Sequence, residues 1–204
     1  ELGGWDLWST VGVEAANPYS GMLQGESCSA FARAFLLTGN ERIFDAAMKS
    51  LELMITPVEK GGTCFIEGES LYFEERPELI RNTILNGWIF ALFGIYDLWL
   101  ITSEETYMNL FTRSVSSLIA SIEFYDRGYW SNYDLRNNIA NPFYHNLHIA
   151  QIRALYEVVK DERLLHKVNQ WETFGKSRLK KARAVLVKVR QRVFSGHNFN
   201  RAIG

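Results

Sequence analysis

The sequence predicts a mostly α-helical protein with the fold of an (α/α) toroid, complete or partial. Such a fold is built from stacked helical hairpins, and here short β-hairpin excursions are expected at one end. The main observation is a repeat of an apolar segment, a turn, a cap residue and an acidic first turn. The cap residues Asn40, Ser103 and Asp161 stand 63 and 58 residues apart. Because one helical hairpin cannot bury its apolar face alone, the hairpins must stack.

The first repeat begins with an apolar helix over residues 31–39, and its second helix follows Asn40. The Asn40 side chain is expected to accept hydrogen bonds from the free N–H groups of that helix. An excursion follows, in which residues 63–67 and 70–74 flank Gly68 and alternate as strands do. This pattern predicts a β-hairpin.

The second repeat has an apolar helix over residues 91–102, with Ser103 as the cap of the next helix. The longest apolar run, from Gly87 to Ile101, is interrupted by Asp97 and is too short to span a membrane, so it fits a buried helix. A second short extended stretch is expected at residues 128–135. The third repeat, residues 152–160 followed by Asp161, has the same order of elements.

A basic tail follows the repeats, and we expect two domains, residues 1–174 and 175–204. Residues 1–172 hold all 23 acidic and 13 of the 22 basic residues, while residues 173–204 hold nine basic residues and no acidic one. The tail is predicted to be helical from residue 176 to 194 and to end at Gly196. Apolar residues at alternating steps of three and four form one stripe on it: Leu179, Ala182, Leu186, Val189 and Val193.

Two roles for this tail stay open. The stripe docks on the toroid and leaves the charges solvated, or the tail contacts an anionic surface. Such a surface would be an anionic polysaccharide, a membrane, or the acidic body of a second subunit in a homodimer. A nucleic-acid role would rest on the tail alone, and we expect no nucleic-acid partner.

The amino-acid composition indicates the class of protein and the compartment in which it works. Of the 204 residues 47% are hydrophobic and 22% are charged, which is typical of a globular protein. Cys28 and Cys64 are too few for a disulfide framework, so a reducing compartment and a cytoplasmic location are expected. The alternative is the secretory pathway, if a leader or an N-terminal region precedes Glu1.

Four polar clusters lie at helix starts or on excursions, where a toroid places its cleft. They cover residues 17–25, 72–77, 133–136 and 141–148. Their carboxylates and phenols can carry protons, and their arginines can clamp anionic groups. His145 and His148 are too few for a metal site and are expected to cap the helix or to form hydrogen bonds in the cleft. We therefore expect no metal site.

These clusters resemble the C-terminal domain of D-glucuronyl C5-epimerases, from about residue 5 to residue 174. The most specific matches are Leu-Asn-Gly at 85–87 with Tyr-Asp-Leu at 96–98, and the Tyr-Asp-Leu-Arg tetrapeptide at 133–136. Tyr-Phe-Glu-Glu-Arg-Pro at 72–77 and Tyr-His-Asn-Leu-His at 144–148 also match. The resemblance implies an (α/α) toroid and an isomerase that inverts C5 of glucuronate residues in a heparosan-like polysaccharide, without a cofactor.

The resemblance also implies site residues. Glu75 and Tyr144 match the proton carriers, Tyr133 is a further catalytic residue, and Arg136 is the expected clamp on the substrate carboxylate. Fixed donors there would stabilise the enediolate that forms when C5 loses its proton. Further substrate-binding residues are expected in the same clusters and in the Leu-Asn-Gly match: Glu74, Arg76, Gln24, His145 and His148 in the clusters, and Asn86 in the match.

The chain departs from the family pattern in three respects. Arg76 stands where the family commonly has Tyr, the spacing from Tyr133 to Tyr144 is shorter than in the animal enzymes, and their β-rich N-terminal regions are not in this sequence. Two alternatives to the epimerase therefore stay open. One is a polysaccharide lyase that shares the proton abstraction at C5, and the other is a non-catalytic protein that binds a uronic-acid polysaccharide.

Overall fold

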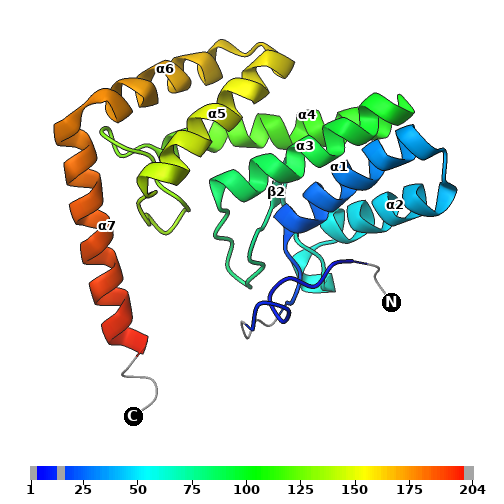
Figure 1. Cartoon of the computed structure of the whole chain (residues 1–204), viewed down its shortest axis with the longest axis horizontal. Coiled ribbons are helices and arrows are strands. Elements are labelled where there is room, and N and C mark those ends of the chain that lie inside the picture. The colour runs from blue at the N-terminus through cyan, green and yellow to red at the C-terminus, as the bar shows by residue number, and fades with distance from the viewer. Residues whose placement is uncertain (1–3, 13–16, 200–204) are drawn as a thin grey trace. The chain divides into compact units, whose positions relative to one another are not determined.

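A computed structural model describes residues 4–12 and 17–199 of the chain, which form two compact units (Figure 1). The N-terminal unit covers Glu1–Ala120 and the C-terminal unit covers Ser121–Gly204. This division differs from the expected domains, 1–174 and 175–204, because the helical tail belongs to the same compact unit as the third repeat.

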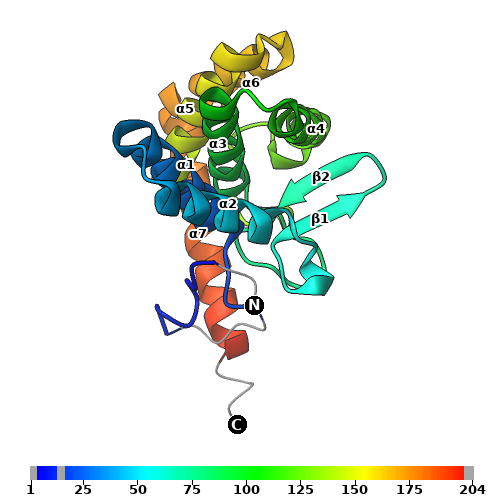
Figure 2. The same cartoon turned by 90° about the vertical axis from the view of Figure 1, so that its right-hand side faces the viewer.

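The N-terminal unit contains two helical hairpins and one β-hairpin. Its helices are α1 (Gly21–Thr38), α2 (Glu41–Ile55), α3 (Leu85–Thr102) and α4 (Glu105–Ser121), with a short 3-10 helix at Val58–Lys60. The strands β1 (Cys64–Glu67) and β2 (Ser70–Phe73) lie between α2 and α3 in the chain, and Figure 2 shows them as an antiparallel pair.

Helix α3 forms the centre of this unit because it is apolar on nearly every side. Length and composition alone would let Leu85–Thr102 cross a membrane, but 61% of this stretch is buried within the fold, as in a core helix. The backbones of α1 and α3 meet at two glycines. A Cβ atom on Gly25 would lie 2.5 Å from Ala91 Cα, and one on Gly94 would lie 2.3 Å from the Gly25 carbonyl oxygen.

A buried carboxylate on α3 forms hydrogen bonds to α1. Asp97 on α3 accepts hydrogen bonds from Ser29 Oγ at 2.5 Å and from Arg33 Nε at 2.9 Å, both on α1. Since Asp97 is only 8% exposed, these charge-assisted bonds satisfy a carboxylate that would otherwise be costly to bury.

The predicted β-hairpin is confirmed. Cys64 pairs with Phe73 and Glu67 pairs with Ser70, and Gly68 in the turn has a φ of 59°, which glycine adopts without strain. The hairpin is tied to α4 through Leu71, whose N–H donates to Ser117 Oγ at 2.9 Å and whose carbonyl accepts from Ser114 Oγ at 2.9 Å. These bonds hold β2 in place, and β2 leads directly into the candidate site.

The C-terminal unit consists of α5 (Pro142–Val159), α6 (Glu162–Lys176) and α7 (Arg178–Phe199), after a 3-10 helix at Ile122–Tyr125. The stretch 128–135, which was expected to be extended, forms isolated bridges between Asp126 and Ser131 and between Asn132 and Ile139. The predicted end of the last helix at Gly196 is wrong, because α7 continues to Phe199.

The helix caps confirm two of the three predicted positions. Asn40 caps α2 and Asp161 caps α6, each by accepting from a backbone N–H in the first turn. The prediction for Ser103 is wrong. Ser103 ends α3 in the left-handed conformation, with a φ of 57°, in the place that Gly39 and Lys160 occupy after α1 and α5. The repeat is therefore a helix closed by a left-handed residue.

The tail helix docks on its unit, but not by the expected face. Ala184 on α7 is only 1% exposed, whereas Leu179 is 84% and Leu186 is 70% exposed. The docking face carries cations that lie over aromatic rings, and the apolar stripe points away from the unit. Within the C-terminal unit, the apolar stripe is therefore not the face by which α7 docks.

Candidate active site

The ten predicted site residues are divided between the two compact units, and the two groups are described separately. The N-terminal unit holds Gln24, Glu74, Glu75, Arg76 and Asn86. The C-terminal unit holds Tyr133, Arg136, Tyr144, His145 and His148.

Glu74 joins three segments of the N-terminal unit. Its backbone N–H donates to the Thr63 carbonyl at 2.8 Å, and its own carbonyl accepts from the N–H of Gly21, the first residue of α1, at 2.8 Å. Its fully buried carboxyl group accepts from Thr83 Oγ1 at 2.5 Å and from the Asn82 N–H at 3.3 Å. This group therefore closes the loop that runs from Glu75 to α3.

Burial raises the pKa of Glu74 from 4.5 to about 7, and the hydrogen bonds from Thr83 and Asn82 offset part of this effect. In the unfolded chain the same carboxyl group titrates near its ordinary value. Its contribution to stability is therefore fully present below pH 4.5 and is lost as the pH rises through 7.

We expect Glu74→Gln to stabilise the protein at pH 8, because the variant has no buried charge there. The gain over wild type should be on the order of 3 kcal/mol at most and should disappear near pH 4.5. Chemical denaturation at pH 5 and pH 8 measures it, with the exposed Glu69→Gln as the control. An equal difference from wild type at both pH values would contradict the assigned titration.

Glu75 lies against the first turn of α3. It is 8% exposed, and its Oε2 atom is 3.5 Å from Asn86 Nδ2. A Cβ atom on Gly87 would lie 2.5 Å from the same Oε2 atom, so glycine at position 87 leaves the space that the carboxylate occupies. Glu75 is thus a fixed carboxylate that can accept a proton.

Arg76 points in a different direction from its neighbours in the sequence. It is exposed, its Nε atom lies 3.8 Å from Glu78 Oε1, and its guanidinium lies 5.7 Å from the centre of the Trp8 ring. An exposed guanidinium can pair with an anionic ligand.

The side-chain amide of Gln24 forms hydrogen bonds with the main chain of Trp5. Its Oε1 atom accepts from the Trp5 N–H at 3.0 Å, and its Nε2 atom donates to the Trp5 carbonyl at 2.8 Å. Gln24 is fully buried, so its amide holds the segment before α1 in place. This arrangement does not support the predicted role of Gln24 in substrate binding, which stays a prediction.

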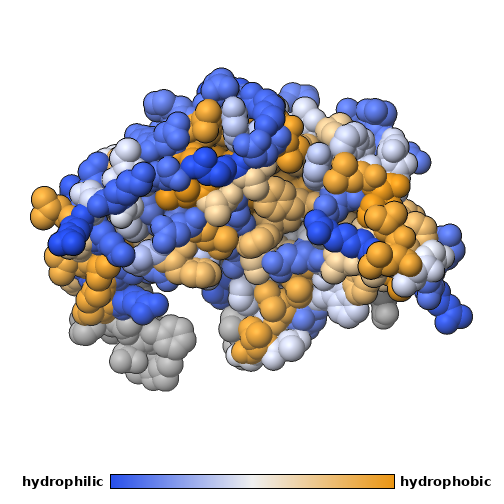
Figure 3. Space-filling model, turned by 45° about the horizontal axis from the view of Figure 1, so that its top comes forward, coloured by the Kyte–Doolittle hydropathy of each residue, from blue (hydrophilic) through white to orange (hydrophobic). Residues whose placement is uncertain are grey.

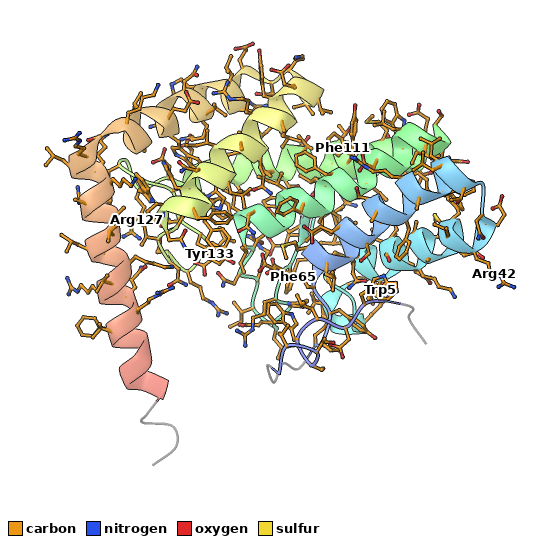
Figure 4. All side chains as sticks on the ribbon, in the orientation of Figure 1. Trp5, Arg42, Phe65, Phe111, Arg127 and Tyr133 are labelled. Carbon is orange, nitrogen blue, oxygen red and sulfur yellow. The ribbon has the colours of Figure 1, made fainter. Side chains whose placement is uncertain are left out.

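The second group is built around two phenol rings. The rings of Tyr133 and Tyr144 meet edge to face, with their centres 4.8 Å apart. Tyr133 lies on the loop before α5 (Figure 4), and its N–H donates to the Asn138 carbonyl at 2.6 Å. Tyr144 lies in the first turn of α5, where its N–H donates to the side chain of the cap residue Asn141 at 2.9 Å. Loop and helix together fix both rings.

The Tyr-Asp-Leu-Arg tetrapeptide is held by its aspartate. Asp134 is 4% exposed and accepts from the Asn138 N–H at 3.1 Å and from Asn138 Nδ2 at 2.7 Å. Arg136, between these two residues, is exposed. The turn therefore presents a guanidinium close in sequence to the phenol of Tyr133.

His145 and His148 are fully buried and share Ser131 as a partner. Ser131 Oγ lies 2.9 Å from His145 Nδ1 and 3.0 Å from His148 Nδ1, and His145 Nε2 lies 3.2 Å from the Trp171 carbonyl. That carbonyl only accepts, so His145 donates from Nε2 and accepts at Nδ1 from Ser131, while His148 donates from Nδ1 to Ser131.

Burial lowers the pKa of His145 to about 4 and that of His148 to about 3. Both rings therefore stay neutral near pH 7, and through Ser131 they brace the loop before α5. No described residue joins them in a group of three or more metal-binding side chains. Their predicted role in substrate binding stays a prediction.

Sequence reasoning missed three residues that shape the two groups: Thr83, Gly87 and Ser131. Gly87 was part of the Leu-Asn-Gly match, and a helical glycine next to a buried carboxylate is a signal for close approach. Thr83 and Ser131 follow no periodic pattern, and only the folded chain shows their partners.

Comparison with known proteins agrees with the motifs. Residues 1–173 match the family described as D-glucuronyl C5-epimerase C-terminus. The chain belongs to this family.

Two curated relatives extend this result. A D-glucuronyl C5-epimerase of Caenorhabditis elegans is 29% identical over 175 residues, which cover 75% of this chain and 28% of that protein. An uncharacterized protein of Methanocaldococcus jannaschii is 32% identical over 142 residues, which cover 68% of this chain and 46% of that protein. The chain thus spans less than half the length of the curated relatives it matches.

Two solved structures show the fold. The chain is similar to cellobiose 2-epimerase from Spirochaeta thermophila, with a TM-score of 0.52, 13% identity, and coverage of 74% of this chain and 41% of that chain. A sugar epimerase from a ruminal bacterium gives a TM-score of 0.55, also at 13% identity, with coverage of 84% and 47%. The predicted class, a mostly helical (α/α) toroid, is confirmed.

Proposed function

We propose that this chain is a polysaccharide epimerase that inverts C5 of glucuronate residues in a heparosan-like polymer. The observation that carries the proposal is the position of Glu75, a fixed carboxylate at the N-terminus of α3 with space left by Gly87. Membership of the C5-epimerase family and the residues that match its motifs support it. The partner would be an anionic uronic-acid polysaccharide.

The proposed reaction needs two proton carriers and one clamp. Glu75 takes the C5 proton, and the electron pair of the broken C–H bond moves toward the neighbouring carboxylate, which becomes an enediolate. Arg136 neutralises the charge that builds up there. Tyr144 then donates its phenol proton to the opposite face of C5, so that C5 is inverted and no bond to C4 is broken.

Tyr133 is proposed to act on the same step. Its ring lies edge to face against Tyr144, and both phenols belong to motifs of the family. A neighbouring phenol can donate a hydrogen bond to the phenolate that Tyr144 becomes, which makes loss of its proton easier.

Incubation with heparosan in deuterated water tests the proposal. An epimerase places deuterium at C5 and leaves the chain length unchanged. A lyase, which shares the first step, expels the C4 substituent and yields an unsaturated uronate that absorbs in the ultraviolet. Without deuterium at C5 and without ultraviolet absorption, the proposed reaction would be refuted for this substrate.

A non-catalytic protein that binds uronic-acid polysaccharide is the second candidate. Arg76 favours it, because an exposed guanidinium replaces the phenol that the family commonly has. Two results would support this candidate over the active epimerase. The wild-type chain would bind heparosan without placing deuterium at C5, and the Arg76→Tyr variant would place deuterium at C5.

Arg136→Lys is expected to slow the reaction at least about tenfold although the charge is kept, because an ammonium does not match the planar fork of a guanidinium on a carboxylate. The rate of C5 deuterium incorporation measures it. Arg153→Lys on α5, where Arg153 pairs with Glu172 on α6, is the control. A wild-type rate for Arg136→Lys would show that Arg136 is not the clamp.

A further inference from the structure

Helix α7 is held to its own unit by one face. Lys180 lies 4.0 Å from the centre of the Phe174 ring, and Arg183 lies 4.0 Å from that of Tyr129. Ala184 is buried, and Gln191 accepts from the Ile139 N–H at 2.9 Å and donates to the Asn137 carbonyl at 2.8 Å. These contacts extend over three turns of the helix, so they fix which side of α7 faces away.

The side that faces away is apolar. At 100° per residue, Leu186 lies on the opposite side of the helix from Ala184 and Gln191. Figure 3 shows apolar side chains at the edge of the molecule where α7 runs. The exposed fractions are 84% for Leu179, 70% for Leu186, and 54% for both Val189 and Val193.

Cations border this exposed stripe on both sides. The helical period places Arg178 and Arg192 along one border and Arg190 along the other, and all three are exposed. Arg183 is also exposed and lies on the same side as Arg190, but its guanidinium packs over the Tyr129 ring. Residues 173–204 contain no acidic residue, so nothing in this segment of the sequence offsets the positive charge. An apolar stripe between two rows of cations is the pattern of helices that lie in a membrane interface.

We propose that α7 binds flat on the surface of an anionic phospholipid bilayer. In this arrangement the stripe enters the boundary between headgroups and acyl chains, and the bordering arginines contact lipid phosphates and carboxylates. A polysaccharide would use the cations alone and would leave the stripe in water. A second copy of α7 would cover the stripe but would set the arginines of one helix against those of the other.

Vesicle sedimentation with the full chain tests this proposal. We expect binding to vesicles of phosphatidylcholine and phosphatidylserine at a ratio of three to one, and binding about tenfold or more weaker to phosphatidylcholine alone. Raising the salt from 50 mM to 500 mM should release most of the protein, because exposed charges are screened at high ionic strength.

Two double variants separate the contributions of stripe and charge. Leu186→Gln with Val189→Gln, and Arg190→Gln with Arg192→Gln, should each weaken binding to the anionic vesicles about tenfold or more. Leu36→Gln with Leu37→Gln is the matched control, because these leucines of α1 are 69% and 86% exposed and lie outside α7. Circular dichroism and thermal unfolding confirm that each variant is folded.

Three results would overturn the proposal. The first is equal binding to neutral and anionic vesicles, and the second is equal loss of binding in the control. The third is absence of vesicle binding together with a dimer, measured by light scattering, that the Leu186 and Val189 variant breaks. This third result would assign the stripe to a second copy of the chain.

Discussion

Tyr144→Phe is expected to leave the fold intact and to slow C5 deuterium incorporation by about 10²–10⁴-fold, the usual contribution of a general acid–base group. The phenyl ring can keep the edge-to-face contact with Tyr133, so the substitution removes only the hydroxyl group. Tyr156→Phe, on the same helix with its hydroxyl 3.4 Å from Glu162, is the matched control. A normal rate in the control and a slow rate in the variant would assign the loss to Tyr144.

Glu75→Gln should lower the same rate over the same range of about 10²–10⁴-fold, because an amide cannot take the C5 proton. The substitution keeps the size of the side chain, so the space beside Gly87 stays filled. Exposed Glu69→Gln provides the control. If Glu75→Gln and Tyr144→Phe both exchange the C5 hydrogen at the wild-type rate, the assignment of the two carriers is wrong.

The largest effect on stability is expected for Gly94→Ala. The added Cβ atom would lie 2.3 Å from the Gly25 carbonyl oxygen, and a backbone atom in a packed helix cannot move aside as a flexible side chain can. Helices α1 and α3 must therefore separate, and we expect a loss on the order of 3 kcal/mol in the free energy of unfolding. Urea denaturation measures this loss.

Gly175→Ala is the matched control for this substitution. Gly175 also lies in a helix, α6, but the nearest atoms to an added Cβ are 4.0 Å away. Alanine there should stabilise the protein by about 0.5–1 kcal/mol, because it favours the helix and restricts the unfolded chain. If both variants were destabilised equally, the loss in Gly94→Ala would reflect removal of glycine rather than contact between the two backbones.

The sequence predicted the fold where local chemistry decides it. Asn40 and Asp161 cap helices by hydrogen bonds within their own first turn, and the hairpin around Gly68 depends on a residue that tolerates positive φ. Ser103 misled because serine favours a cap position, yet here it ends a helix in the left-handed conformation. Its N–H donates to the Trp99 carbonyl, as that of Gly39 does to the Phe35 carbonyl, so Ser103 takes a place that the sequence pattern assigned to a different role.

The docking of α7 could not be predicted from its apolar stripe. Hydrophobic periodicity locates the apolar side of a helix, but it does not show which side has a partner. The unit offers α7 the aromatic rings of Phe174 and Tyr129, over which Lys180 and Arg183 lie as cations over π systems. Only the folded chain brings those rings to the helix.

The candidate site was predictable in its residue types and less so in their roles. The motifs located Glu75, Tyr133 and Tyr144, whose roles in proton transfer stay a prediction. Gln24 comes from an equally polar motif but is engaged by the Trp5 main chain, and His145 is engaged by Ser131 and Trp171. Long-range partners decide such roles, and spacing along the chain does not reveal them.

The buried titratable groups make the stability of the two units depend on pH in opposite directions. Glu74 makes the N-terminal unit less stable as the pH rises through 7. The neutral forms of His145 and His148 stabilise the C-terminal unit above pH 6.5, and this contribution is lost as the pH falls toward 4 and 3. We therefore expect falling pH to destabilise the C-terminal unit through these two histidines, and rising pH to destabilise the N-terminal unit through Glu74.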